Sequence, residues 1–142
     1  MSGRPKKPGR MTVSMRILLY VDYSRRSELL VREVAERFWP SGTVVRVLAV
    51  VDSAPPSAAE LLSDAGGSLE TVMRLREERC RQLAEEAAAV LRAKGLTVET
   101  SVRAAPVRRA VREEAGQWPA DLVIPNRWLR RFNCCRPASR LE

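Results

Sequence analysis

The stretch that decides the fold is residues 16–22, Arg-Ile-Leu-Leu-Tyr-Val-Asp, a continuous apolar run that ends in an acid. A run of this kind is typical of a strand that is buried on both faces of a parallel sheet. Residues 43–51, Thr-Val-Val-Arg-Val-Leu-Ala-Val-Val, have the same character, and Asp52 follows them. Two buried strands joined through a helical segment predict a right-handed crossover, and therefore a sheet that carries helices on its faces.

The segments that follow these two strands have the spacing of amphipathic helices. Ser24 can cap the first helix, which should stop at the Trp-Pro-Ser-Gly sequence of residues 39–42. A longer helical pattern covers residues 69–94, and Gly95 closes it. The apolar stripe of the first helix consists of Leu30, Val31, Val34, Ala35 and Phe38. The stripe of the long helix consists of Leu69, Val72, Met73, Cys80, Leu83, Ala84, Ala87 and Leu91, so that Cys80 is interpreted as a small buried hydrophobe.

Two further strands and a short helix complete the pattern. Residues 53–68 are rich in Ala, Ser, Pro and Gly and predict a loop. Residues 96–103 alternate between polar and apolar, which is typical of an edge strand, and Pro106 then opens a short helix. Residues 121–125, Asp-Leu-Val-Ile-Pro, predict a fourth strand. The order of these elements predicts an α/β fold, a doubly wound parallel sheet of four strands, in one domain over residues 15–125.

The positive charge of the chain lies at its two ends. The 142 residues include 25 Lys and Arg against 17 Asp and Glu, so the formal net charge is +8. Residues 1–10 carry four basic side chains and no acid, and residues 127–142 carry five arginines and one acid. We interpret residues 1–14 as a flexible basic arm and residues 126–142 as a divergent basic tail. Nucleic acid is therefore not an expected partner of the folded body, and binding through the two basic tails stays open as an alternative function.

The residue types that are missing exclude several classes of function. The sequence has no histidine, which excludes a Ser-His-Asp triad, a Cys-His pair and a His-ligated metal. Its three cysteines, Cys80, Cys134 and Cys135, lack C-x-x-C spacing and are odd in number, which argues against a zinc site and a disulfide framework. A cytoplasmic location is expected. The apolar run at residues 17–21 is too short for a signal peptide or a membrane span.

Five segments together carry a resemblance to a known family. They are RILLYVDYS at 16–24, VRVLAVVD at 45–52, KGLTVET at 94–100, AAPVRRAV at 104–111 and ADLVI at 120–124. In order and spacing they resemble the universal stress protein (UspA-like) family. The resemblance implies a doubly wound sheet with strand order 3-2-1-4-5. It also implies that ATP, in the members that bind nucleotide, lies across the carboxyl ends of the strands.

The resemblance suggests three candidate contacts to an adenine nucleotide. Asp22 ends the first strand, Ser24 lies in the same loop, and Val51 corresponds to a position that contacts adenine in the family. Each has a structural alternative. Ser24 can serve as a helix cap, Val51 as a core valine, and Asp22 as a partner of the next helix N-terminus.

The chain departs from the family where the phosphates are bound. The family motif G-x-x-G-x9-G-[S/T] follows the fourth strand, and its glycines let the backbone approach the phosphates. Here Asn126 and Leu129 stand where the first two glycines belong, Ser139 stands where the third belongs, and no glycine follows Gly116. The sequence therefore establishes no cofactor, and ATP is the one that the resemblance suggests.

The last strand of the family is also missing or divergent. The fourth strand should then be an edge that needs cover. The cover expected is a second copy in a homodimer, another protein, or the tail itself through Trp128, Leu129 and Phe132. A truncated or frame-shifted relative is the alternative explanation of residues 126–142.

We therefore predict a stress-response binding or regulatory domain that is non-catalytic and in which ATP binding is impaired or absent. One alternative is an ATP-binding or weakly ATP-hydrolysing protein in which Asp22 is the metal-associated acid. A phospho-receiver domain is excluded, because the third strand ends in Arg103 rather than in an acceptor aspartate. No catalytic residue, metal ligand or membrane partner is predicted.

Overall fold

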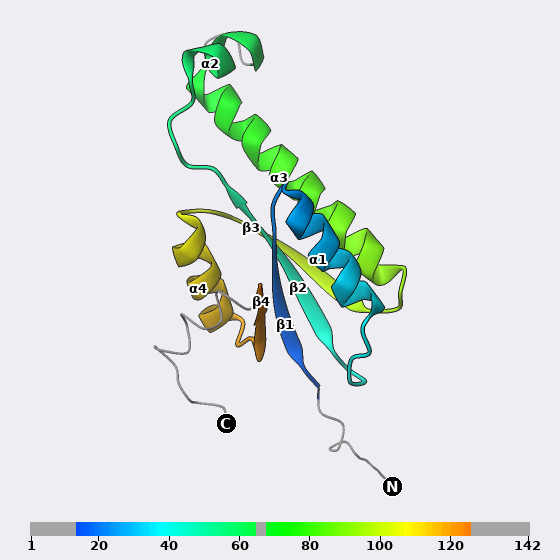
Figure 1. Ribbon diagram of the computed structural model, residues 1–142. Helices are drawn as coiled ribbons and strands as arrows, with labels where there is room; N and C mark the ends of the chain where they lie inside the picture. The colour runs from blue at the N-terminus through cyan, green and yellow to red at the C-terminus, as the bar shows by residue number, and fades with distance from the viewer. Residues whose placement is uncertain (1–13, 65–67, 126–142) are drawn as a thin grey trace, which may run out of the picture.

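The computed structural model describes residues 14–64 and 68–125, which form a twisted sheet with helices on both faces (Figure 1). The basic arm and the basic tail predicted from the sequence fall almost wholly outside these residues. The elements in chain order are β1 (Arg16–Val21), α1 (Arg25–Glu36), β2 (Val44–Val51), α2 (Ala58–Asp64), α3 (Leu69–Arg92), β3 (Thr97–Ala104), α4 (Val107–Gln117) and β4 (Leu122–Ile124).

The four strands of the described residues are parallel and lie in the order β3-β2-β1-β4. This confirms the predicted doubly wound α/β class. β1 pairs with β2 along its whole length, from Arg16 opposite Val44 to Val21 opposite Ala49. β4 pairs with β1 only from Leu122 to Ile124. β3 pairs with β2 alone, so the polar and apolar alternation of residues 96–103 correctly indicated an edge strand.

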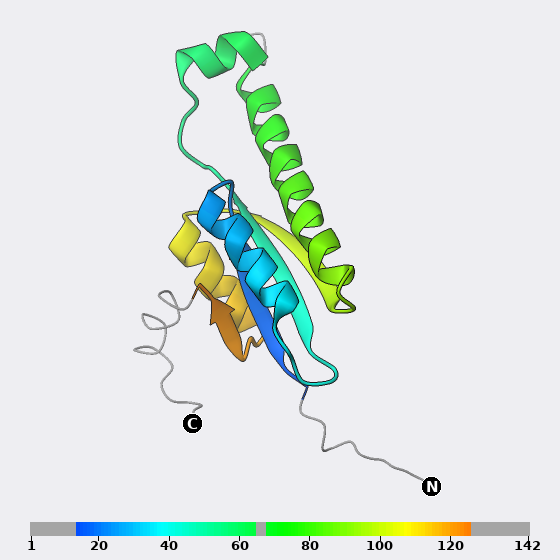
Figure 2. The ribbon, with the colours of Figure 1, turned by 45° about the vertical axis from the view of Figure 1, so that its right-hand side comes forward.

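The two faces of the sheet have separate cores. α1 and α3 pack side by side on one face, and α4 covers the other (Figures 1 and 2). The larger core lies under α1 and α3. The smaller core, under α4, consists of Leu18, Leu48, Val111 and Val123. Alternate residues of β1 thus face opposite cores, as expected for a strand buried on both sides.

The helix ends follow their predicted signals, with one exception. The Ser24 side chain caps α1, and Gly95 takes a positive φ of 90° directly after the last turn of α3. Phe38 was expected on the apolar stripe of the first helix, but its side chain is fully exposed. The reason is that α1 ends at Glu36 and its C-cap Arg37 is extended, so the helical period no longer applies at residue 38.

The segment predicted as a loop, residues 53–68, contains the short helix α2. Arg76 of α3 fixes it. The Arg76 guanidinium donates to both carboxylate oxygens of Glu60 at 2.9 Å, and to the backbone oxygens of Asp52 and Ala54 at 2.7 Å. Arg76 of α3 therefore fixes the course of the segment that connects β2 to α2.

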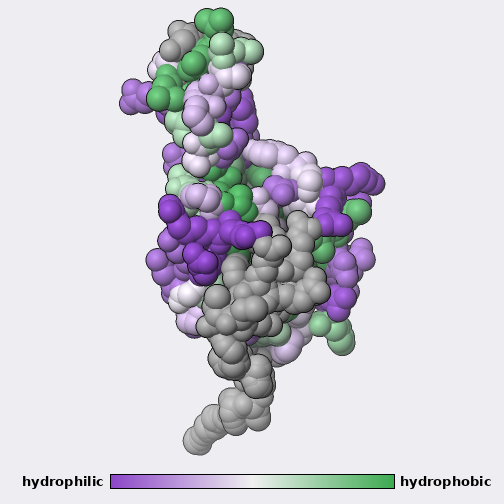
Figure 3. Space-filling model, turned by 60° about the vertical axis from the view of Figure 1, so that its left-hand side comes forward, coloured by the Kyte–Doolittle hydropathy of each residue, from purple (hydrophilic) through white to green (hydrophobic). Residues whose placement is uncertain are grey.

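α2 and the first turns of α3 project beyond the sheet, and apolar surface is visible on this projection (Figure 3). Leu62 and Leu69 are exposed there. Leu69 was expected on the apolar stripe of the long helix. It is exposed because the first turns of α3 have no strand beneath them.

Candidate functional site

The turn that joins β1 to α1 holds two of the three predicted site residues. Asp22 follows the last residue of β1, and its Oδ1 accepts hydrogen bonds from Ser24 N at 2.8 Å and Ser24 Oγ at 2.6 Å. Ser24 Oγ accepts a hydrogen bond from the backbone N–H of Ser27 at 3.1 Å. The Ser27 hydroxyl in turn accepts one from the backbone N–H of Asp22 at 3.0 Å. The turn is closed by its own hydrogen bonds, so Asp22 and Ser24 both have structural roles.

A hollow of about 310 Å³ opens beside this turn, between α1 and α3; we call it the α1–α3 hollow. Asp22 and Ser24 line it at the carboxyl end of β1. Its base is apolar, and charged side chains of both helices form its rim. The full lining is Val21, Asp22, Tyr23, Ser24, Ser27, Glu28, Val31, Arg32, Leu83, Glu86, Ala87 and Val90.

The third predicted residue, Val51, lies elsewhere. It is the last residue of β2, is 4% exposed and belongs to the core under α1 and α3. It lines a different hollow, of about 520 Å³, together with Met73 and Val102. The structure thus brings Asp22 and Ser24 together and places Val51 apart from them. The neighbouring Val50 packs on the opposite face of the sheet, in the group that includes Tyr20.

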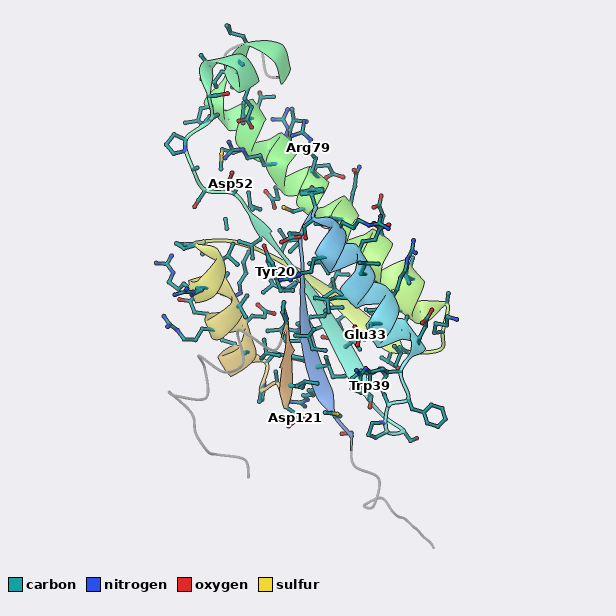
Figure 4. The ribbon with its side chains drawn as sticks, viewed as in Figure 1. Tyr20, Glu33, Trp39, Asp52, Arg79 and Asp121 are labelled. Atoms are coloured by element: carbon teal, nitrogen blue, oxygen red, sulfur yellow. The ribbon has the colours of Figure 1, made fainter. Side chains whose placement is uncertain are left out.

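Two side chains near the carboxyl ends of the strands are kept in their neutral forms. Burial raises the pKa of Tyr20, a residue of β1 that is labelled in Figure 4, to about 12, and the negative charge of Asp22 adds to the effect. Burial also raises the pKa of the Cys80 thiol, and the charge of Asp52 contributes. Cys80 Sγ donates to the backbone oxygen of Val50 at 3.4 Å. These features are those of a buried structural thiol, in agreement with its position on the apolar stripe of the long helix.

A second group of charged side chains joins α4 to β2 and β3, and the sequence analysis did not single it out. Glu114 of α4 is 3% exposed and accepts hydrogen bonds from Arg46 Nη1 at 2.7 Å and from Arg103 Nε. Arg46 also donates to Glu99 Oε1 at 2.8 Å, and its guanidinium lies 4.8 Å from the centre of the Trp118 ring. The available signal was Arg46 itself, the one charge within the apolar run of β2.

Hydrogen bonding determines the charge state of Glu114. Burial alone would raise the pKa of this carboxyl, but hydrogen bonds from Arg103, Arg46 and Ser101 outweigh burial and hold the pKa below its ordinary value. Glu114 is therefore an ionised carboxylate that fixes α4 on the sheet. None of the predicted site residues belongs to this group.

Two kinds of feature are absent from the described residues. Within residues 14–64 and 68–125, no three side chains of the metal-binding types gather closely enough to hold an ion. In the same part of the chain, no helix has the length and apolar character needed to cross a membrane. The positions that replace the family's glycines, Asn126, Leu129 and Ser139, lie outside the described residues.

Comparison with known proteins identifies the family. The family model described as "Universal stress protein family" matches residues 14–125, which is most of the chain. The chain belongs to the universal stress protein family. No curated protein sequence matches this universal stress protein significantly.

Solved structures, two of them described as universal stress proteins, have the same fold. A family member from Burkholderia pseudomallei is 18% identical, with 92% of this chain and 94% of that chain covered and a TM-score of 0.56. The hypothetical protein MJ0577 is 22% identical, with 78% and 72% covered and a TM-score of 0.58. The universal stress protein from Archaeoglobus fulgidus is 19% identical, with 78% and 74% covered and a TM-score of 0.53. At these identities the likeness concerns the fold.

For this universal stress protein, the nucleotide contacts of Asp22, Ser24 and Val51 stay predictions. The geometry shows what each side chain does without a ligand. Asp22 and Ser24 close the turn before α1, and Val51 fills the core. Asp22 and Ser24 line the α1–α3 hollow, whereas Val51 lines the hollow formed with α3 and β3.

Proposed function

We propose that this chain is a non-catalytic binding or regulatory member of the universal stress protein family, acting in the stress response, in which ATP binding is weak or absent. The observation that carries the proposal is the separation of the predicted contacts. Asp22 and Ser24 are hydrogen-bonded to each other, and Val51 is buried in another part of the site. The sequence adds that no glycine follows Gly116, so the family's phosphate loop has no counterpart here.

The charge around the α1–α3 hollow supports the same proposal. Asp22, Glu28 and Glu86 line it, against the single guanidinium of Arg32. The third and fourth backbone N–H groups of α1 are also engaged, because Ser27 N donates to Ser24 Oγ and Glu28 N donates to Ser24 O. A triphosphate beside Asp22 would meet the like charges of these carboxylates, and it would find two N–H groups of the first turn of α1 already engaged.

Hydrolysis of ATP would make a further demand on Asp22. In the alternative enzyme, this carboxylate would hold the metal ion that bridges the phosphates. Its Oδ1 already accepts two hydrogen bonds from Ser24. Coordination through that oxygen would open the turn that caps α1, which supports a non-catalytic role.

The experiment that tests the proposal is equilibrium binding of ATP with magnesium to the full chain, by isothermal titration calorimetry. Asp22→Ala is compared with Asp52→Ala, a matched carboxylate after the neighbouring strand that accepts from Ala54 N at 3.0 Å. We expect no saturable binding at millimolar ATP. In a separate assay of ATP hydrolysis, the release of phosphate should not exceed that in buffer alone. Saturable micromolar binding that Asp22→Ala abolishes and Asp52→Ala retains would overturn the proposal.

We further propose a homodimer that covers the free edge of β4. Among the described residues, β4 pairs with β1 on one side only. An apolar hollow of about 220 Å³ lies beside it, lined in part by Leu30, Trp39, Leu122 and Ile124. An open sheet edge next to apolar surface favours association. Light scattering coupled to size exclusion tests this, because a chain that stays monomeric at all concentrations contradicts it.

We also propose a cytoplasmic location and no role in binding nucleic acid. A cytoplasmic location is favoured by Cys80, which is buried and unpaired. Binding of nucleic acid is not proposed, because the excess positive charge lies in residues 1–10 and 127–142.

A further inference from the structure

The α1–α3 hollow has a base that suits an apolar group. Val21, Val31 and Ala87 are buried beneath it, and Leu83 and Val90 of α3 complete the apolar part of the lining. The two helices run side by side on this face of the sheet (Figure 2). The hollow therefore removes apolar surface from water on two sides of any group that enters it.

The rim of the hollow has an excess of negative charge. Its anionic groups are Asp22 and Glu28 beside α1 and Glu86 on α3, and Arg32 is the cation among the lining residues. Arg32 lies 3.5 Å from Glu28 and so offsets that carboxylate. Arg25 also lies near Glu28, at 3.9 Å. Asp22 and Glu86 have no ion-pair partner within the described residues, so the lining carries a net negative charge.

An aromatic ring stands at the mouth of the hollow. Tyr23 follows Asp22 in the chain, is 67% exposed and belongs to the lining. Burial raises the pKa of its hydroxyl, Cys80 and Glu86 of α3 add to the rise, and Arg79 of the same helix opposes it, so the ring lies close to α3. An exposed aromatic ring near a carboxylate can attract an organic cation to its face.

We propose that the α1–α3 hollow binds small organic cations, with the apolar body on Val21, Val31 and Ala87 and the ammonium group between Glu86, Asp22 and the ring of Tyr23. This inference deepens the proposed function, since it names what a site without phosphate recognition accepts. Charge complementarity favours the cation, and the same carboxylates repel an anion of equal size.

The test uses benzyltrimethylammonium as the probe and benzenesulfonate as the control of opposite charge. Both are titrated into the full chain at low ionic strength, and binding is followed by backbone amide chemical shifts. We expect saturable millimolar binding of the cation, with shifts in residues 22–32 and 83–90, and no saturable binding of the anion. Equal binding of both ions, or no saturation by the cation, overturns the proposal.

Three variants locate the cation. Glu86→Gln and Tyr23→Leu should each weaken binding by about two- to fivefold, as expected for one exposed charge or one exposed ring. Glu70→Gln is the matched control, because Glu70 lies on the same helix but lines the hollow beside Val51. It should leave binding unchanged. Equal effects of Glu86→Gln and Glu70→Gln would show a non-specific attraction to α3 and overturn the site.

The ATP experiment and the cation experiment can fail separately. Tight ATP binding would overturn the proposed function, whether or not benzyltrimethylammonium binds. If ATP does not bind and the cation does not saturate, the proposed function stands and this inference fails. The two failures are therefore distinguishable.

Discussion

Replacing Glu114 with alanine should destabilise the protein more than any exposed charge change on α4. The carboxylate is buried and accepts charged hydrogen bonds from Arg46 and Arg103. A hydrogen bond to a charged group contributes about 1.5–3 kcal/mol. In the variant, Arg46 keeps its ion pair with Glu99, and Arg103 keeps its ion pair with Glu113. The loss of each hydrogen bond should therefore cost an amount at the low end of this range. We expect a loss of about 3 kcal/mol in the free energy of unfolding.

Urea unfolding followed by circular dichroism measures this loss, with Glu113→Ala as the control. Glu113 pairs with Arg103 at 3.2 Å, but its side chain is 44% exposed, so its removal should cost about 0.5 kcal/mol. The pKa of Glu114 in the folded state lies below 4.5, so its contribution is complete above that pH and is lost as the pH falls through the folded value. The difference between the wild type and Glu114→Ala should shrink accordingly. Equal losses for the two variants at pH 7 would refute this reasoning.

Three further changes have defined outcomes. Ser24→Ala removes the N-cap of α1 and should lower the free energy of unfolding by about 1 kcal/mol, measured by the same urea titration, and no loss would show that the cap is dispensable. Tyr20 and Tyr23 are the two tyrosines of the chain. In an absorbance titration at alkaline pH, Tyr20→Phe should remove a phase near pH 12, and survival of that phase would assign it to Tyr23. Phe38→Ser should change the melting temperature little, because the side chain is already in water, and a marked decrease would indicate a contact that the structure does not contain.

The sheet was predictable because the pattern of apolar residues in each strand reflects which of its faces are buried. β1 and β2 are apolar at successive positions, since both of their faces are covered. Residues 96–103 alternate because successive side chains point to opposite faces of the sheet, and α3 covers β3 on one of them. The cap at Ser24 and the turn at Gly95 were predictable for a similar reason, because both depend on local backbone geometry.

What the sequence left out depends on contacts between distant segments. α2 is fixed by Arg76, which lies 16 residues after Glu60, and no local pattern indicates that pairing. The partners of Glu114 come from β2 and β3, so its burial cannot be inferred from the period of α4 alone. The separation of Val51 from Asp22 has a simpler cause. Val21 of β1 lies opposite Ala49 of β2, so Val51 lies two residues further along the sheet, where the first turns of α3 and the end of β3 line another hollow.

The bonds of Arg76 have a consequence for how this protein can vary among its relatives. Two of them end on backbone oxygens, those of Asp52 and Ala54, which every amino acid supplies. The connection between β2 and α2 can therefore change its side chains freely and keep its course, whereas a change at residue 76 would release it. The residue that fixes the course of this connection lies in a helix more than twenty residues further along the chain. The connection can therefore vary in sequence and keep its shape.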